Sequence, residues 1–104
     1  MNENLVSVGE WCLSTFGPTS SNIRIAIRLN EELAELLKEL SQDDNSKDAA
    51  KEMADVQIVL YHLAWLMNVD LEEEVNKKML INRNRKWKLD SNGCGYHIKE
   101  LVNE

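Results

Sequence analysis

The sequence predicts an all-α protein, a four-helix bundle-type chain. Its 104 residues include only four glycines and one proline, so turns are few and elements are long. Apolar residues recur at helical spacing over long segments, and the hydrophobic fraction of 43% is typical of a globular chain. We expect one helical domain over residues 1–90 and a short irregular C-terminal tail over residues 91–104.

Four helices are expected along the chain. The first covers about residues 4–16 and ends at Gly17-Pro18, a pair that stops a helix. The second covers about 23–40, and a polar loop separates it from the third, about 47–68. The fourth covers about 70–88, with acidic residues in its first turn and basic residues near its end, as the helix dipole favours. Beyond it, we expect a turn and then a short extended piece over 96–98.

The charge and the cysteines narrow the function classes. A formal charge of −6 argues against binding to nucleic acid or to an anionic membrane, and favours a cation or an anion that arrives with one. Cys12 and Cys94 lack metal-ligand spacing, so both are expected to be free thiols in a reducing cytoplasm. The longest apolar run, residues 63–67, is too short to cross a bilayer, and no secretory signal is visible.

The third helix is apolar on nearly every side. Between Met53 and Met67 its clearly polar side chains are Asp55, Gln57, Tyr61 and His62. Such a helix must be buried nearly all round, and a chain of this length has few elements to cover it. The pattern favours a two-fold homodimer, with the centre of a monomeric bundle as the alternative.

Carboxylates gather on the second and third helices at helical spacing. Glu31, Glu32 and Glu35 share one side of the second helix, and Glu52 and Asp55 stand three residues apart on the third. Two facing i, i+3 pairs would bring four carboxylates together across a bundle. Hard oxygen ligands of this kind suit Mg²⁺ or Mn²⁺.

Asp55 is the most informative of these acids, because the residues around it are apolar. An ionised carboxylate in such surroundings needs a partner, which could be Arg24, Arg28, a lysine or a metal ion. The plainer interpretation, a solvated acidic face, fits Asp55 less well than it fits Glu31.

The fourth helix carries Lys78, Asn82 and Arg85 within an arc of about 60°. An ammonium, an amide and a guanidinium on one arc could bind phosphate oxygens, although an ordinary basic helix end has the same composition. On the first helix, Trp11 and Phe16 could stack on a nucleobase or could belong to the core.

Together these residues resemble a known family. Glu31-Glu32-x-x-Glu35 followed by Glu52-x-x-Asp55 is similar to the E-E-x-x-E…E-x-x-D signature of the MazG-like, all-α nucleoside triphosphate pyrophosphohydrolases. The spacing of Lys78, Asn82 and Arg85 looks like the phosphate-binding element of that family's last helix. The resemblance spans about residues 23–88.

The resemblance implies a homodimer or a dimer of dimers that cleaves a (deoxy)nucleoside triphosphate to the monophosphate and pyrophosphate. The cofactor would be Mg²⁺, with Mn²⁺ as a substitute, and a metal-activated water would attack. By analogy, the residues would divide into metal ligands, catalytic residues and substrate-binding residues. Metal ligands would be Glu32, Glu35, Glu52 and Asp55; Glu31 and Glu35 would be catalytic; Lys78, Asn82 and Arg85 would bind the triphosphate of the substrate. Apart from the resemblance, we expect Trp11 to bind substrate by stacking on the base.

Two other functions compete with this one. A non-catalytic helical interaction module could use the same acids to hold a structural cation or a basic partner. A relative could also act on a phosphoribosyl-nucleotide in place of a free triphosphate.

Overall fold

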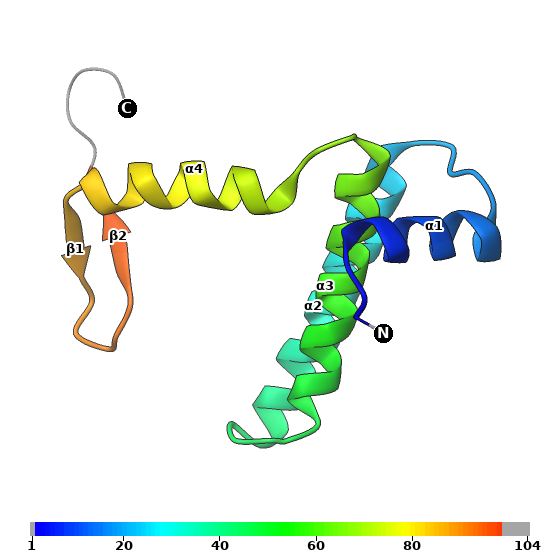
Figure 1. Ribbon diagram of the computed structural model, residues 1–104. Coiled ribbons are helices and arrows are strands. Elements are labelled where there is room, and N and C mark those ends of the chain that lie inside the picture. The colour runs from blue at the N-terminus through cyan, green and yellow to red at the C-terminus, as the bar shows by residue number, and fades with distance from the viewer. Residues whose placement is uncertain (1, 99–104) are drawn as a thin grey trace. The chain divides into compact units, whose positions relative to one another are not determined.

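The computed structural model describes residues 2–98 and is mostly helical (Figure 1). Its elements, in chain order, are four helices and two short strands. They are α1 (Leu5–Phe16), α2 (Asn22–Gln42), α3 (Ala49–Leu66), α4 (Leu71–Asn84), β1 (Trp87–Leu89) and β2 (Gly95–His97). The first three helices match the expected segments to within two residues at each end. The fourth does not.

The chain divides into two compact units, Met1–Leu71 and Glu72–Glu104. The first unit contains α1, α2 and α3, and the second contains most of α4 and the two strands.

Local signals explain where α1 begins and ends. Asn4 caps its first turn: the Ser7 backbone N–H donates to Asn4 Oδ1 at 2.9 Å, and the Asn4 N–H donates to Ser7 Oγ at 2.8 Å. Gly17 ends the helix with φ of 77°, a left-handed conformation that glycine adopts without strain, and Pro18 follows. The Gly17-Pro18 stop is therefore confirmed.

The first unit is built around α3. α2 and α3 lie side by side, joined by a tight polar loop, and α1 crosses the far half of α3 (Figure 1). α1 lies close to α3 at Gly9, where an added Cβ would overlap the Trp65 ring. Among residues 2–98, the buried side chains are few and mostly small: Val8, Cys12, Ile25, Ala49, Val59, His62 and Ala64.

Many larger apolar side chains of this unit are exposed in the single chain. On α2 they are Ile23, Ile27, Leu33 and Leu37, on α3 they are Met53 and Ile58, and Met67 follows directly after α3. α1 and α2 therefore cover only part of the surface of the apolar third helix. The expectation that a second copy of the chain covers the rest stays a prediction.

In the second unit the sequence-based prediction is wrong at the end of the helix. α4 stops at Asn84, not near residue 88, because residues 87–89 pair as a strand with residues 95–97. Trp87 ties this hairpin to the helix: its Nε1–H donates to the Asn82 carbonyl at 2.9 Å, and its ring lies 5.7 Å from the His97 ring.

The hairpin also corrects the expectation of an irregular tail. Residues 95–97 are a regular strand, and the Asp90 carboxylate orders the turn by accepting from the backbone N–H groups of Asn92 and Cys94. The expected extended piece at 96–98 is therefore confirmed in part. Residues 99–104, the rest of the predicted tail, lie outside the described residues.

Two further expectations can be compared with the fold. Cys12 is buried, Cys94 is exposed, and both are free thiols. None of the helices within residues 2–98 is both long enough and apolar enough to span a bilayer.

Candidate active site

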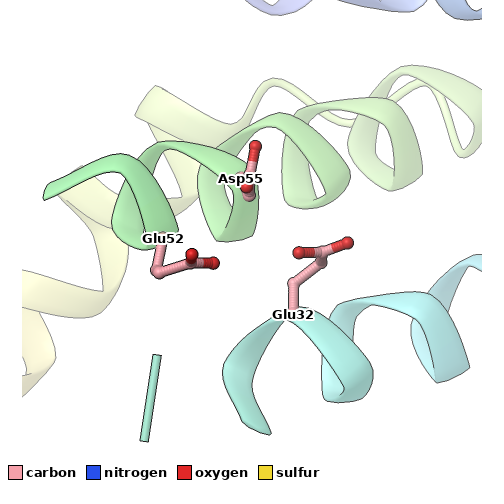
Figure 2. Close-up of side chains that lie close together, drawn as sticks. All are labelled: Glu32, Glu52 and Asp55. Carbon is pink, nitrogen blue, oxygen red and sulfur yellow. The ribbon is translucent and has the colours of Figure 1, made fainter. Parts of the chain in front are cut away.

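Three carboxylates converge between α2 and α3. Glu32 extends from the middle of α2 toward the side of α3 that carries Glu52 and Asp55 (Figure 2). One oxygen from each of the three side chains lies within 4.8 Å of the others. We call Glu32, Glu52 and Asp55 the carboxylate cluster. The i, i+3 spacing places Glu52 and Asp55 on one face of α3, and the packing of α2 against that face brings Glu32 to them.

The cluster is electrostatically unfavourable without a cation. Partial burial raises the pKa of the Glu52 carboxyl, and the negative charges of Asp55 and Glu35 raise the pKa further. Glu52 and Glu32 are partly buried. An added divalent ion would relieve this repulsion, and carboxylate oxygens are the ligands that Mg²⁺ and Mn²⁺ prefer.

Asp55 differs from expectation in its surroundings. The sequence indicated a carboxylate enclosed by apolar side chains, but Asp55 is exposed in the single chain. The physical reason is that its apolar neighbours Met53 and Ile58 are themselves exposed, at 53% and 39%. The structure therefore places Asp55 in the cluster but gives it no buried environment within one chain.

The other two predicted acids lie on α2 beside the cluster. Glu35 is exposed, and within residues 2–98 it does not join the group of converging oxygens, although its charge acts on Glu52. Glu31 is exposed as well. Of the four carboxylates predicted as metal ligands, the structure thus brings three together and leaves Glu35 at the edge.

Arg28 was named from the sequence as a candidate partner of Asp55, and the structure gives it another partner. Its Nη2 lies 3.5 Å from Glu32 Oε1, one helical turn away on α2. Its charge also reaches the interior of the unit. Burial lowers the pKa of His62 and Arg28 lowers it further, whereas burial raises the pKa of Cys12 against an opposing effect of Arg28. The charge of Arg28 therefore acts on a residue of α1 and on a residue of α3.

A pocket of about 410 Å³ opens beside Arg28, at the junction of α1 and α2. Its lining comes from the end of α1, the following loop and the first turns of α2. It consists of Phe16, Pro18, Thr19, Ser20, Arg24, Ile25 and Arg28. Sequence reasoning singled out some of these residues but not the pocket. The i, i+4 series of Arg24, Arg28 and Glu32 is the signal that could have indicated it.

Trp11, predicted to contact a base, lies next to this pocket. Its ring packs edge-on against Phe16, with the ring centroids 5.3 Å apart, and Phe16 lines the pocket. Both side chains are largely exposed, Trp11 at 54% and Phe16 at 65%. The two aromatic side chains therefore form an accessible apolar surface, not part of a closed core.

The predicted phosphate-binding residues belong to the second unit. Lys78 and Asn82 are on α4, whereas Arg85 lies just beyond its end, with its N–H donating to the Asn82 carbonyl at 3.2 Å. Lys78 is exposed, and Asn82 and Arg85 are partly buried. Asn82 Oδ1, an acceptor, is buried without a hydrogen-bond partner among the described residues.

Comparison with known families now bears on this arrangement. The phosphoribosyl-ATP pyrophosphohydrolase (PRA-PH) family matches residues 15–78, a segment that includes the whole carboxylate cluster. A solved structure, the MazG-like pyrophosphohydrolase of cyanophage S-2L bound to dGDP and three catalytic Mn²⁺ ions per active site, superimposes with a TM-score of 0.72. It is 30% identical to this chain, over 91% of this chain and 93% of that one. The chain belongs to the MazG-like pyrophosphohydrolase family.

Curated relatives of this MazG-like chain carry a more specific description. The dATP/dGTP diphosphohydrolase of cyanophage S-2L is 40% identical over 69 residues, which are 64% of this chain and 65% of the relative. The enzyme of that name from Salmonella phage PMBT28 is 34% identical over 91 residues, 88% of this chain. The chain spans 65% of the length of the first relative and 29% of the second.

Proposed function

We propose that this MazG-like protein is a divalent-metal-dependent enzyme that hydrolyses a purine deoxynucleoside triphosphate, dATP or dGTP, to the monophosphate and pyrophosphate. The observation that carries the proposal is the carboxylate cluster, which unites Glu32, Glu52 and Asp55 from two helices. The proposal is also supported by a solved relative that binds dGDP and three catalytic Mn²⁺ ions, and by relatives described as dATP/dGTP diphosphohydrolases.

The residues present fit a divalent metal. The cluster offers hard anionic oxygens from side chains within 4.8 Å of one another, and no softer donor is among the residues that form it. Glu35, one turn along α2 from Glu32, would complete the set of ligands by a change of its side-chain rotamer. When bound, Mg²⁺ or Mn²⁺ would neutralise phosphate charge and lower the pKa of a coordinated water.

The protein's own residues would divide the remaining work. Glu31 and Glu35 are exposed and share one side of α2 with Glu32, so either carboxylate could orient an attacking water and accept its proton. Lys78, Asn82 and Arg85 would hold the triphosphate by charge-assisted hydrogen bonds. Trp11 and its partner Phe16 would offer an aromatic surface to the base.

A pyrophosphate-release assay tests the proposal. Folded protein with Mg²⁺ or Mn²⁺ should release pyrophosphate from dATP or dGTP, and chelation should stop the reaction. Asp55→Asn and Glu35→Ala should each lower kcat by about a hundredfold or more, because each removes a charged group from the reacting centre. Lys38→Gln, at an exposed position of α2, is the matched control and should leave the rate unchanged. Absence of turnover on every nucleoside triphosphate with either metal would contradict the proposal.

One observation favours a second substrate class. The family that matches residues 15–78 is described as phosphoribosyl-ATP pyrophosphohydrolase. That substrate is a purine nucleotide with the same triphosphate, so the same carboxylates could serve it. Parallel assays on dATP, dGTP and phosphoribosyl-ATP separate the two, and faster turnover of phosphoribosyl-ATP would replace the first proposal with the second.

The non-catalytic alternative is tested by thermal shift. Binding to the native state raises the melting temperature by mass action, so an enzyme should be stabilised by Mn²⁺ and further by dGDP. A module that only holds a structural cation should respond to Mn²⁺ and not to dGDP.

The assembly and the compartment belong to the proposal as well. We infer a homodimer or a dimer of dimers, because apolar side chains on α2, α3 and α4 remain exposed in one chain. We infer a reducing cytoplasm, because Cys12 and Cys94 are free thiols and the substrate is an intracellular nucleotide.

A further inference from the structure

We propose that Arg28 is a substrate-binding residue. In the metal-free chain it pairs with Glu32. When Glu32 binds a divalent ion instead, Arg28 binds the α-phosphate of the nucleotide. This inference rests on the proposed function and adds to it a residue outside the E-E-x-x-E…E-x-x-D signature. It also assigns the pocket at the junction of α1 and α2 to the nucleoside.

Arg28 contacts both the carboxylate cluster and the pocket. Its guanidinium contacts the carboxylate cluster through Glu32, with 3.5 Å between Nη2 and Oε1, and it also lines the pocket. No other residue belongs to both the pocket lining and the recorded ion pairs of the described chain. Arg28 therefore lies between the carboxylate cluster, which would bind a metal ion, and the pocket, which would bind an organic group.

The charge along one side of α2 changes sign next to Arg28. Arg24 and Arg28 precede Glu32 on the same side of the helix, at i, i+4 spacing, so this side changes from positive to negative between Arg28 and Glu32. A metal-bound nucleotide can match this order of charge. Its divalent cations lie at the phosphates, which would face Glu32, and its uncharged nucleoside would lie on the Arg28 side. The α-phosphate, which joins the two parts, then falls beside Arg28.

The pocket combines apolar walls with hydroxyl groups. Phe16, Pro18 and Ile25 give it apolar walls that suit a planar base, and Thr19 and Ser20 supply hydroxyl groups that suit a sugar. Its volume of about 410 Å³ lies in the range of small-molecule sites. Arginine is suited to the phosphate end because its fork can bind two anionic oxygens at once.

Arg28 can easily exchange its present partner, Glu32, for another anion. The Arg28 side chain is 58% exposed and that of Glu32 23%, so their ion pair is weak and costs little to break. A carboxylate that ligates a divalent ion no longer needs the guanidinium, whose charge then favours an incoming phosphate. Metal binding and nucleotide binding would thus favour one another through Arg28.

Two binding measurements on Arg28→Gln test this exchange. Mn²⁺ alone, titrated into the metal-free protein by calorimetry, should bind several-fold more tightly to the variant, because a competing positive charge is gone. The non-hydrolysable α,β-methylene-dGTP, titrated with saturating Mn²⁺, should bind about ten- to a hundredfold more weakly, because a charged hydrogen bond is lost. Pyrophosphate with Mn²⁺ should bind as in the wild type, since it lacks the α-phosphate.

Controls separate this role from a structural one. Lys38→Gln also removes a positive charge from α2 and should change none of the three affinities. Arg28→Lys keeps the charge without the fork and should recover part of the analogue affinity; it also provides the comparison if Arg28→Gln does not fold. A merely structural role of Arg28 would weaken Mn²⁺ and analogue binding together.

The inference is overturned if Arg28→Gln binds the analogue as the wild type does, or if it binds Mn²⁺ more weakly. Loss of pyrophosphate affinity in place of analogue affinity would overturn the placement beside the α-phosphate. If the wild type hydrolyses dATP or dGTP and Arg28→Gln behaves normally, only this inference fails. If the wild type neither binds nor hydrolyses any nucleotide, the proposed function fails and takes this inference with it.

Discussion

At the scale of single residues, the carboxylate cluster places binding in conflict with stability. Oxygens of Glu52, Asp55 and Glu32 lie within 4.8 Å of one another, and burial, followed by the charges of neighbouring acids that include Asp55 and Glu32, raises the pKa of Glu52. Glu52→Gln removes one negative charge and should raise the melting temperature measured in the presence of a chelator. The same variant should lose most of the stabilisation that Mn²⁺ gives the wild type.

Differential scanning fluorimetry with and without Mn²⁺ checks both parts of this prediction. Glu72→Gln, an equal charge change at an exposed position of α4, should follow the wild type in both conditions. If Glu52→Gln were less stable than the wild type in chelator and still gained fully from Mn²⁺, the cluster could not be the metal site.

His62 makes a separate prediction about pH. Burial and then the charge of Arg28 lower the pKa of its imidazole below the ordinary value of about 6.5. The unfolded chain therefore takes up a proton at a higher pH than the folded chain does. The stability that a neutral His62 contributes is complete above about pH 6.5 and is lost as the pH falls from there toward the folded pKa.

The measurement is the melting temperature from pH 7.5 to 5.5 for the wild type and for His62→Leu, which cannot titrate. The wild type should lose more of its melting temperature over this range than the variant does, whatever their difference at pH 7.5. Parallel curves would show that another group sets the acid sensitivity.

At the scale of elements, the contact of α1 with α3 depends on a missing side chain. Gly9 is buried, and an added methyl group would overlap the Trp65 ring close to its attachment point. Alanine favours a helix by up to about 1 kcal/mol over glycine, but overpacking a close contact costs about 1–3 kcal/mol. Gly9→Ala should therefore destabilise the protein on balance.

Chemical denaturation measures the free energy of unfolding for this comparison. Glu10→Ala, at the adjacent exposed position of α1, should leave that free energy nearly unchanged. A Gly9→Ala protein more stable than the wild type would mean that α1 does not pack on α3 through Gly9.

The elements that the sequence predicted well are those with local signals. Gly17-Pro18 and the polar loop before α3 mark helix ends by their own chemistry, and α1 to α3 follow them closely. The end of α4 has no such mark, because residues 83–88 are mostly basic side chains that favour a helix. What ends α4 is the pairing of Trp87 with His97, ten positions along the chain, which periodicity alone does not indicate.

The candidate site shows the same division. The i, i+3 spacing predicts that Glu52 and Asp55 share a face, and the structure agrees. Which acid of α2 meets them depends on how the two helices are aligned, and this favours Glu32 over Glu35. The i, i+4 spacing of Arg28 and Glu32 allows their ion pair, although the sequence pattern suggested Asp55 as a partner of Arg28.

At the scale of the whole molecule, the exposed apolar side chains predict self-association. Ile23, Ile27, Leu33 and Leu37 of α2 fall within an arc of about 120° that is turned away from the α3-facing residue Ile25. Leu37 alone is 63% exposed and Ile23 65%. Burial of apolar surface contributes about 25 cal/mol for each Å², so a two-fold contact between such faces would be strongly favourable.

Sedimentation velocity on the full chain tests this last prediction. The wild type should sediment as a dimer or a dimer of dimers at tens of micromolar protein. Ile27→Glu with Leu37→Glu should shift it toward the monomer, because two charges per chain would have to be desolvated in the contact. Ser14→Glu with Thr15→Glu adds the same charge at exposed positions of α1 and should leave the assembly intact. Should the double variant not fold, Leu37→Glu alone gives the comparison. A wild type that is monomeric at these concentrations would contradict this prediction. Some other partner would then have to cover the apolar face of α2, since an exposed apolar face of this width is rare on a monomer.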